Sequence, residues 1–566
     1  SLTTGIYSFG NNNYRISSLG NGVYTVYSLT QNGFCAANGN GSMYFAASSD
    51  AAEAKWLVTK TSDGYVFQSA AHQTYMTSDA GLSSNAENIS ISDLNASVTD
   101  YSVKYDLSAL NALDSLNGIQ VISRLHTLGL SRSDLMNPEA NMTSLNTNIQ
   151  SALSGLPTQT VQYTGTDVDD LNQFLQNNTG KIVQLTQDIQ VYKNTNGSFG
   201  IIMVPSDTIL DGNGHRLVMK AGYTEAPDVG VVLYVYKDGV IPSTNCGVKN
   251  LSTDIPYVNS INVFSADNIL IENNTLNNAT KSGIMISDEY GSTVNGIIRG
   301  NTINNVGDDA IAVYGNHSNL LIDSNRISGA KGFAGIAISC LQNGQQIRVD
   351  NETTGPHDII VTGNVVSGCS GEALYCIGSY KTYITYNTLR DSILEGVCLD
   401  SGCIGNYFAH NEVVNNGIAG GLPGVSIDNG IYNIVDSNNV YNNSCSGIKL
   451  VRTGLGNIIV NNICTDNAYN QMGAKSSGID IEPLAVETEN LGYIDGLGSN
   501  WNVVLNNTVT GSHDFGVFIA DDDTANNGGS SCENVIMYNK FSSAYTFGAA
   551  DFSSMSSTVK NNITLN

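Results

Sequence analysis

Three stretches decide the fold: GVCLDSG at 396–402, GVSIDNG at 424–430 and SGIDIEP at 477–483. Each contains five residues that start on glycine, place apolar side chains at the second and fourth positions, and vary at the third and fifth. Because successive side chains of a strand point to opposite faces, this period of two predicts short strands with one face in a core. Six further stretches fit the pattern: GIMIS (283–287), AIAVY (310–314), GIAIS (335–339), ALYCI (373–377), GIKLV (447–451) and GVFIA (516–520).

An asparagine recurs between these strands, in stretches such as IENNTL, IDSNRI and VLNNTV. The positions are Asn274, Asn301, Asn325, Asn364, Asn387, Asn411, Asn438, Asn462, Asn507, Asn539 and Asn562. Their spacings are 27, 24, 39, 23, 24, 27, 24, 45, 32 and 23 residues, which is a repeat of about 24 with three large insertions. Three strands per repeat and no room for helices predict a right-handed parallel β-helix. The asparagines are expected to form an inward ladder at one turn.

The composition and net charge of the chain limit the classes of partner that the protein can bind. The chain has 566 residues and a formal net charge of −26, which arises from only 24 lysines and arginines. Such a surface repels nucleic acid and anionic membranes, so a neutral partner is easier to accommodate. No run of apolar residues is long enough to span a bilayer. The ten cysteines include no CxxC pair, so buried free thiols are favoured over metal ligands or disulfides. Few lysines and many Asn-x-Ser/Thr triplets favour an extracellular protein.

Three regions are expected along the chain. Residues 1–80 alternate Tyr-rich strands with Gly and Asn turns, and KWLVTKTSDGYVFQSAAHQTYMTSD (55–79) resembles the repeat of ricin-type β-trefoil lectins, with Trp56 at the tryptophan position of that family. This module is either sugar-binding or a packing cap. Residues 81–158 show apolar positions at helical spacing and are expected to form a short helical linker. Residues 159–566 are expected to form the β-helix. The predicted class is therefore all-β.

Acidic residues interrupt the variable positions of the late strands. Asp400, Asp428 and Glu482 occupy the fifth position and Asp480 the third, so all four are expected on one outward face. Neighbouring coils lie ~4.8 Å apart, which puts the backbones of Asp400 and Asp428 one spacing apart. One interpretation is a solvent-exposed row of acids whose mutual repulsion is reduced by Lys449. The other is a functional set of carboxyl groups whose pKa values are separated, so that one group stays protonated as an acid and another serves as a base. Glycosidases need such a pair, and both kinds of pair are open: Asp400 with Asp428 suits the short separation of retaining enzymes, and Asp428 with Asp480 or Glu482 suits the longer separation of inverting enzymes.

Other side chains on this face are candidates for substrate binding. The cations Lys449 and Arg452 lie between Asp428 and Asp480 in the chain. The aromatic residues Tyr314, Tyr375 and Trp501 suit stacking on sugars, although each also suits ordinary packing. Three long loops leave the same edge of the strands, at 340–357, 483–501 and 521–532, and are expected to wall a cleft. We expect no cofactor. The cluster Asp521, Asp522 and Asp523 suits either a structural calcium ion or a solvated loop.

The coil pattern over about 190–566, together with DTILDGNGHRL (207–217), resembles the right-handed β-helix carbohydrate-active enzymes of the pectate-lyase-like superfamily. Asp308 and Asp309 in GDDAIAV resemble the paired aspartates of polygalacturonases, but the accompanying NTD, GHG and RIK motifs are absent, as is the YG-x-DPH signature of the epimerases. The resemblance implies a glycoside hydrolase acting on a neutral glycan through a pair among the four acids. A lyase, epimerase or fructotransferase on the same scaffold and a non-catalytic adhesin remain open.

Overall fold

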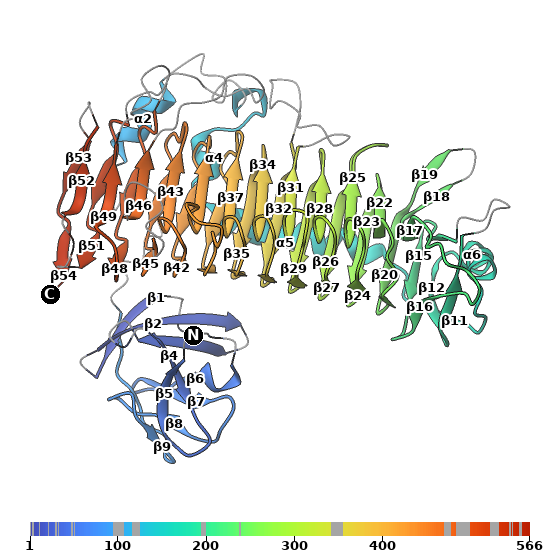
Figure 1. The fold of residues 1–566 in the computed structure, drawn as a ribbon, viewed down its shortest axis with the longest axis horizontal. Helices are drawn as coiled ribbons and strands as arrows, with labels where there is room; N and C mark the ends of the chain where they lie inside the picture. The colour runs from blue at the N-terminus through green and yellow to red at the C-terminus, as the bar shows by residue number, and fades with distance from the viewer. Residues whose placement is uncertain are drawn as a thin grey trace. The chain divides into compact units, whose positions relative to one another are not determined.

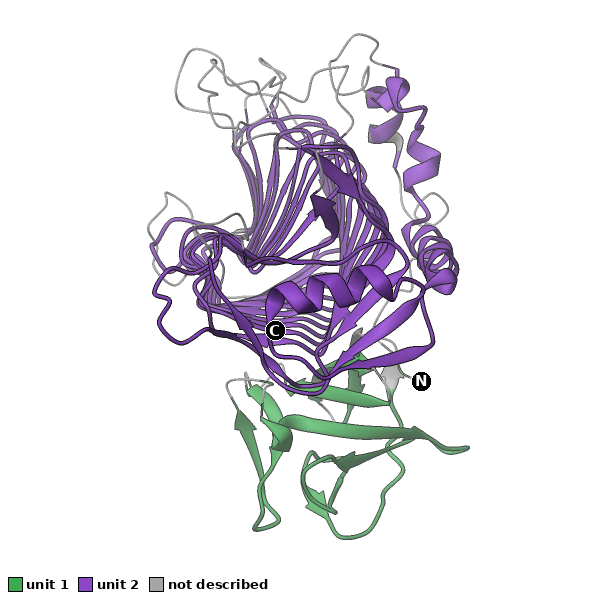
Figure 2. Ribbon diagram, turned by 90° about the vertical axis from the view of Figure 1, so that its right-hand side faces the viewer, with its two compact units in different colours: residues 1–104 green, residues 105–566 purple. Residues whose placement is uncertain are grey.

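The computed structural model of the protein describes the whole chain except residues 1, 3–4, 11, 21, 29–30, 32, 47–48, 50, 94–106, 116–124, 194–199, 237–238, 341–354, 469–476, 483–497, 521–530, 543–544, 546, 554–556 and 566. The chain forms two compact units, residues 1–104 and residues 105–566 (Figure 2). All ten cysteines are buried free thiols, as the absence of paired motifs predicts. In the described part of the chain, no helix is both long and apolar enough to cross a membrane.

Unit 1 is an antiparallel sheet in the order β10-β1-β2-β3-β6-β7-β8-β9, with β4 and β5 paired beside β3. Its longest strands are β2 (Asn12–Gly20), β3 (Val23–Ser28) and β6 (Lys55–Lys60). Trp56 of β6 is fully buried and its indole N–H donates to the carbonyl of Cys35 at 2.8 Å, so this ring is part of the core of the unit. The trefoil resemblance of this unit stays a prediction.

Unit 2 is a right-handed parallel β-helix, as the repeat predicts (Figure 1). Three parallel sheets of 15, 14 and 13 strands run along it, and neighbours in each sheet are one coil apart in sequence. The 15-stranded sheet runs from β11 (Thr160–Tyr163) to β53 (Thr558–Lys560), and the 14-stranded sheet from β13 (Ile189–Val191) to β54 (Ile563–Leu565). Each coil therefore contributes one strand to each face.

The 13-stranded sheet contains the glycine-led strands that fixed the fold. Its strands are β14 (Ile202–Met203), β17 (Val229–Val232), β22 (Asn259–Phe264), β25 (Ile284–Ser287), β28 (Ile311–Tyr314), β31 (Ile336–Ser339), β34 (Leu374–Ile377), β37 (Val397–Asp400), β40 (Val425–Asp428), β43 (Ile448–Val451), β46 (Ser477–Glu482), β49 (Phe515–Ile519) and β52 (Phe547–Asp551).

Packing inside the coil explains the leading glycine. A Cβ on Gly396 would lie 2.4 Å from Cγ1 of Val413, and one on Gly478 would lie 2.1 Å from Cγ1 of Val509. Both valines belong to the 14-stranded sheet, on β39 (Glu412–Val414) and β48 (Thr508–Thr510). The valine side chain takes the place that a Cβ would need, so only glycine lets the two sheets approach this closely.

Helices cover the solenoid at one end and along one face. α6 (Val168–Asn177) buries Val168, Leu171 and Leu175 against the first coils, and Figure 2 shows it crossing that end. Three helices lie along the 15-stranded sheet: α2 (Ser108–Asp114), α4 (Arg132–Leu135) and α5 (Pro138–Ala152). They lie within 81–158, where apolar positions at helical spacing predict helices, but the same range begins with β9 (Leu82–Ser83) and β10 (Ser92–Asp93), which belong to the sheet of unit 1. α6 also reaches the first strand of the 13-stranded sheet, β14, where the side chain of Asn172 hydrogen-bonds the backbone of Ile201 and Met203.

These helices are held to the sheet by specific contacts. Tyr407 donates to Glu139 of α5 at 3.3 Å, and Tyr432 hydrogen-bonds Asp114 of α2. Leu135 of α4 lies over Gly405, where a Cβ would come to 2.6 Å of its side chain. The segment is therefore docked on the β-helix and belongs to unit 2.

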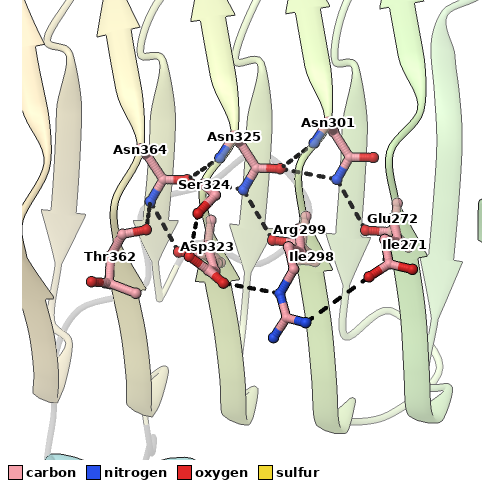
Figure 3. Close-up of polar contacts among 11 residues, drawn as sticks. Ile271, Glu272, Ile298, Arg299, Asn301, Asp323, Ser324, Asn325, Thr362 and Asn364 are labelled. Atoms are coloured by element: carbon pink, nitrogen blue, oxygen red, sulfur yellow. Dashed lines mark hydrogen bonds and ion pairs between the residues drawn. The ribbon is translucent and has the colours of Figure 1, made fainter. Parts of the chain in front are cut away.

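The predicted asparagine ladder is present between the 15- and 14-stranded sheets (Figure 3). Asn325 shows its repeating bonds: its Oδ1 accepts from the backbone N–H of Asn301 at 3.0 Å and from its amide at 2.9 Å. Its own amide donates to the carbonyl of Ile298 and to Oδ1 of Asn364, both at 2.9 Å. The Asn325 side chain thus satisfies two buried backbone groups of the preceding coil and is linked to the following coil through the Asn364 side chain.

Two more ladders occupy the other corners, and the sequence analysis did not predict them. One runs through Asn406, Asn433, Asn457, Asn502 and Asn534, between the 13- and 15-stranded sheets. The other runs through Asn416, Asn443 and Asn467, between the 14- and 13-stranded sheets. All three corners of the later coils are therefore fixed by side-chain amides, which gives the 13-stranded sheet a rigid frame.

We expect Asn325→Ala to lower the midpoint of thermal unfolding of unit 2 by several degrees. The substitution leaves the backbone N–H of Asn301 and the carbonyl of Ile298 buried without their partners, at a cost of about 3 kcal/mol or more. Calorimetry checks this, with Asn148→Ala on the exposed face of α5 as the matched control, for which no loss is expected. Equal stability of the two variants would contradict a structural role for the ladder.

Candidate active site

The register of the 13-stranded sheet brings the predicted acids into one row. Asp400 on β37 pairs with Asp428 on β40, and Val451 on β43 separates Asp428 from Glu482 on β46. In the parallel row of third positions, Lys449 pairs with Asp480. The alternation read from the sequence therefore gives the correct face and the correct coil for each of these residues.

The acidic side chains on this face are far less exposed to solvent than the alternation predicts. Asp400 is 8% exposed and Asp480 is 2% exposed, while Asp428 and Glu482 are half-buried. Buried carboxylates must be paired or protonated, because the charge loses its hydration. A solvated acidic ladder, the structural alternative for this row, does not describe Asp400 or Asp480.

Asp400 accepts hydrogen bonds at both carboxylate oxygens. Tyr375 of β34 donates its hydroxyl to Oδ2 at 2.8 Å, and Ser401 donates to Oδ1 at 2.8 Å. The Tyr375 side chain is itself 8% exposed, and burial followed by the Asp400 charge raises the pKa of its phenol far above the usual value. Tyr375 therefore keeps its proton and serves as a hydrogen-bond donor to Asp400.

Arg452 joins Asp400 to Asp428. Its Nη1 lies 2.7 Å from Oδ2 of Asp428 and 3.8 Å from Oδ1 of Asp400, so these two carboxylate oxygens are at most 6.5 Å apart. Burial, and then the Asp400 charge, raise the pKa of Asp428 to about 8 against the lowering effect of Arg452. Oδ1 of Asp428 is buried and has no hydrogen-bond partner among the described residues. The raised pKa keeps the Asp428 carboxyl protonated near neutral pH.

The backbone places Arg452 for this contact. The residue directly after β43 turns the chain in the left-handed region, with φ +59 at Arg452. The equivalent residues after β37 and β40 are Ser401 (φ 49) and Asn429 (φ 59). The same left-handed turn recurs at the corners of the coils, also with long side chains such as Lys381 and Tyr386, so it is a regular feature of the fold. After β43 it places the Arg452 side chain within reach of the carboxylates of two coils.

The other two acids form a separate pair around Lys449. Its Nζ lies 3.2 Å from Oδ2 of Asp480 and 3.3 Å from Oε2 of Glu482. These contacts, the one with Asp480 first, raise the pKa of Lys449 despite its burial. Ser446 also donates to Asp480 at 3.4 Å. Two cations therefore divide the four predicted acids into two pairs, a division that the sequence analysis did not foresee.

Two glutamates near Asp400 were missed by the sequence analysis. Glu372 and Glu395 directly precede Ala373 and Gly396, the residues that lead into the strands β34 and β37 of consecutive coils. Burial, then Glu395, raise the pKa of Glu372 to about 8, and burial raises the pKa of Glu395 to about 7. Asp309 has the same place before β28, and burial raises its pKa to about 7. The signal available in the sequence was this position immediately before three of the glycine- or alanine-led strands.

The remaining predicted residues lie elsewhere. Asp309 accepts from the backbone N–H of Ala334 at 2.8 Å and from the hydroxyl of Tyr314, whose ring packs with Phe333 and Tyr375. Trp501 is 8% exposed at the corner before β47 (Val503–Leu505), and its indole donates to Glu533, so the structure does not bring it to the acids.

The loop predictions fall mostly on residues that are not described. Of the segments 340–357, 483–501 and 521–532, the structure describes only the ends, so their place beside the acids stays a prediction. Asp521, Asp522 and Asp523 also lie outside the described residues. Among those that are described, no group of three or more His, Cys, Asp or Glu side chains is arranged to hold a metal ion.

A family model described as "Right handed beta helix region" matches residues 239–354, in agreement with the fold. No curated protein matches the chain. Among solved structures, the mannuronan C-5 epimerase AlgE6 A-module of Azotobacter vinelandii is 15% identical, covers 71% of this chain and 100% of its own, and superposes with a TM-score of 0.42.

Two further structures show a similar level of likeness. A tailspike protein of the E. coli bacteriophage HK620, determined with a hexasaccharide, is 13% identical over 69% of this chain and 73% of its own, with a TM-score of 0.41. PfbA, a surface adhesin of Streptococcus pneumoniae, is 12% identical over 69% of this chain and 93% of its own, with a TM-score of 0.35. At these levels of likeness, nothing about activity carries over to this chain.

Proposed function

We propose that this protein is a glycan-acting enzyme that hydrolyses a neutral oligo- or polysaccharide with Asp400 and Asp428. The observation that carries the proposal is the asymmetry of this pair. Asp400 is hydrogen-bonded as an acceptor, whereas Asp428 has a raised pKa and a buried oxygen without a described partner. Two carboxyl groups whose environments separate their pKa values are the arrangement that glycosidic bond cleavage requires.

The chemistry follows from these two states. Protonated Asp428 donates its proton to the glycosidic oxygen as the bond from that oxygen to the anomeric carbon breaks. Ionised Asp400 attacks the anomeric carbon, and water then displaces it while Asp428 takes the water proton back. The backbones of the pair are one coil apart, ~4.8 Å, which favours the short carboxyl separation of ~5 Å found in retaining enzymes.

The charge of the site favours a neutral substrate. Both cations of the face, Arg452 and Lys449, already contact two carboxylates each. The chain as a whole carries a formal net charge of −26. An anionic polymer would meet this field without a cation free of carboxylate contacts on the registered strands. Extracellular location, which the composition favours, is part of the same proposal.

A second candidate is a lyase, epimerase or fructotransferase on the same face. The observation that favours it is the meeting of a phenol, an arginine and a carboxylate at Tyr375, Arg452 and Asp400, since such groups also serve proton abstraction next to a carbonyl. The raised pKa of Tyr375 weighs against it, because a phenol held in its protonated form is a poor base.

Product analysis tests the proposal and separates the two candidates. The full chain is incubated with a panel of neutral and uronate-containing glycans, and the products are followed by chromatography and mass spectrometry. Hydrolysis adds one water per bond cleaved and creates a reducing end. Unsaturated or anhydro products, or sugar inversion without cleavage, would replace the hydrolase with the second candidate, and binding without any turnover would replace both with an adhesin.

We expect Arg452→Gln to move the basic limb of the pH–rate profile upward by about one unit or more. The guanidinium lies 2.7 Å from Oδ2 of Asp428 and lowers the pKa of that carboxyl, and a charge at this distance shifts pKa values by about 1 to 3 units. The measurement is kcat/KM against pH on the best substrate of the panel. Arg452→Lys, which keeps the positive charge, is the control, and its pH–rate profile should stay close to that of the unmutated protein. An unchanged profile in Arg452→Gln would show that Arg452 has no part in positioning the proton.

A further inference from the structure

A group of aromatic side chains lies beside the early strands of the 13-stranded sheet. Tyr234 of β18 (Tyr234–Tyr236) stacks on Phe264 of β22, with ring centroids 5.1 Å apart and planes at 29°. Tyr290 meets Phe264 edge-on at 5.3 Å. Tyr234 and Phe264 are half-buried, whereas Tyr290 is 51% exposed. We call these three residues the aromatic platform.

The hairpin beside the platform adds exposed apolar surface. Strands β18 and β19 (Val240–Pro242) pair antiparallel and project from the coils (Figure 1). Tyr236 and Ile241 of this hairpin are 61% and 50% exposed. Large side chains gathered in the open are uncommon on a soluble surface and mark contact sites for ligands or other molecules.

The platform shares a row with the catalytic candidates but is separate from them. Phe264, Ser287, Tyr314, Ser339, Ile377 and Asp400 occupy successive register positions. Five coil steps put Phe264 ~24 Å from Asp400 along the sheet. Between them, Ser339 and Ile377 are only 1% and 2% exposed, so the row is covered there. The platform is therefore a distinct surface and not the rim of the acidic site.

A buried amide stands on the outer face next to the platform. Asn262, two residues before Phe264 on β22, occupies the same outward row as Met285 and Tyr375. It is 5% exposed, and its Oδ1 has no hydrogen-bond partner among the described residues. An amide oxygen left without a donor beside exposed rings fits a ligand that supplies hydroxyl donors.

The charges around the platform point to the same ligand class. Asp288 and Glu289 directly precede Tyr290, and burial, then Tyr290 and Glu289, raise the pKa of Tyr234 to about 12. Anionic ligands would be repelled by these carboxylates. A neutral carbohydrate offers apolar C–H faces for the rings and hydroxyl groups for the amide.

We propose that the aromatic platform is a second glycan-binding site, for a neutral carbohydrate chain, separate from the carboxylate pair. It extends the proposed function without depending on it, because binding at the platform needs no turnover. A long glycan held at both sites gains effective concentration at the acids, so the intact protein should bind long chains more tightly than short ones.

The test measures binding with turnover disabled. The full chain carrying Asp400→Asn and Asp428→Asn is screened on an array of neutral and acidic glycans, and the best neutral polysaccharide is then used in affinity electrophoresis. We expect Phe264→Ala and Tyr290→Ala each to lower the affinity for that polysaccharide about tenfold or more. Tyr386→Ala is the matched control, because Tyr386 is also a stacked, 45% exposed ring, on His410 at another corner of the coils.

Each outcome of this experiment either supports or overturns the aromatic platform as a glycan-binding site. Weaker binding in the platform variants but not in Tyr386→Ala supports the site even if the unmutated protein cleaves nothing, in which case only the hydrolase proposal fails. Equal retardation of all variants, or no binding to any glycan of the array, overturns the platform. A change in sedimentation of the Phe264→Ala variant would instead assign the surface to contacts between copies of the chain and would also overturn it.

Discussion

Replacing Asp428 by Asn is expected to lower kcat for cleavage of a neutral glycan by ~10² or more, with the fold retained. Asn has the shape of the protonated acid, so the hydrogen bond from Arg452 to the side chain can persist. What is lost is the only proton that the pair holds for the leaving group. Asp400→Asn is expected to cost at least as much, because it removes the nucleophile and leaves the Tyr375 hydroxyl facing an amide.

The matched controls are Asp480→Asn and Glu482→Gln. Both residues belong to the same strand face and contact a cation, but they form the pair around Lys449. We expect these variants to keep most of the activity, and circular dichroism and calorimetry to show that all four fold. Large losses in Asp480→Asn and Glu482→Gln with normal rates in the other two would move the active site two coils along the sheet. Four unaffected variants would remove the carboxylate row from catalysis altogether.

The second large effect concerns stability against pH. Unit 2 is expected to melt about 5 °C lower at pH 8.5 than at pH 6.5. The cause is a set of buried carboxyls whose pKa values are raised to about 7 or 8: Asp309, Glu372, Glu395 and Asp428. In the unfolded chain such groups titrate near pH 4. The folded state therefore binds more protons than the unfolded state above that pH, and stability is lost as pH rises through 7 to 8.

Histidines should flatten the curve below pH 6.5. Burial lowers the pKa values of His317 and His513 to about 4, and those of His357 and His410 are lowered as well. Here the unfolded state binds the extra protons, so these residues cost stability as pH falls from 6.5 towards 4. That loss offsets the gain from the carboxyls in the same window.

Calorimetry between pH 5 and 8.5 measures both the fall in melting temperature above pH 6.5 and the flat region below it. Glu372→Gln, which keeps the neutral shape of the side chain, should make the loss above pH 6.5 shallower, and Glu225→Gln on an ordinary surface glutamate serves as the comparison for removing a carboxyl. A melting temperature that stays level or rises from pH 6.5 to 8.5 would show that these carboxyls are already ionised in the folded protein.

Local patterns in the amino-acid chain are sufficient to predict the coil and its register. Alternation over five residues, a leading glycine and a recurring asparagine are local signals, and each has a local cause: the pleat of a strand, the lack of room for a Cβ, and the unpaired backbone groups of a turn. Because one coil follows another at nearly constant spacing, counting residues sufficed to put Asp400 beside Asp428 and Lys449 beside Asp480.

Which charged side chains contact each other, and how far they are buried, follows from the stacking of the coils and could not be read from the repeat. Arg452 reaches Asp428 and Asp400 because a left-handed turn aims a long side chain across two coils, and periodicity contains no information on side-chain direction at a turn. Glu372 and Glu395 precede the strands, where alternation no longer assigns a face. The pKa of Asp428 depends on water excluded by residues distant in the chain, and that exclusion exists only once the coils have stacked.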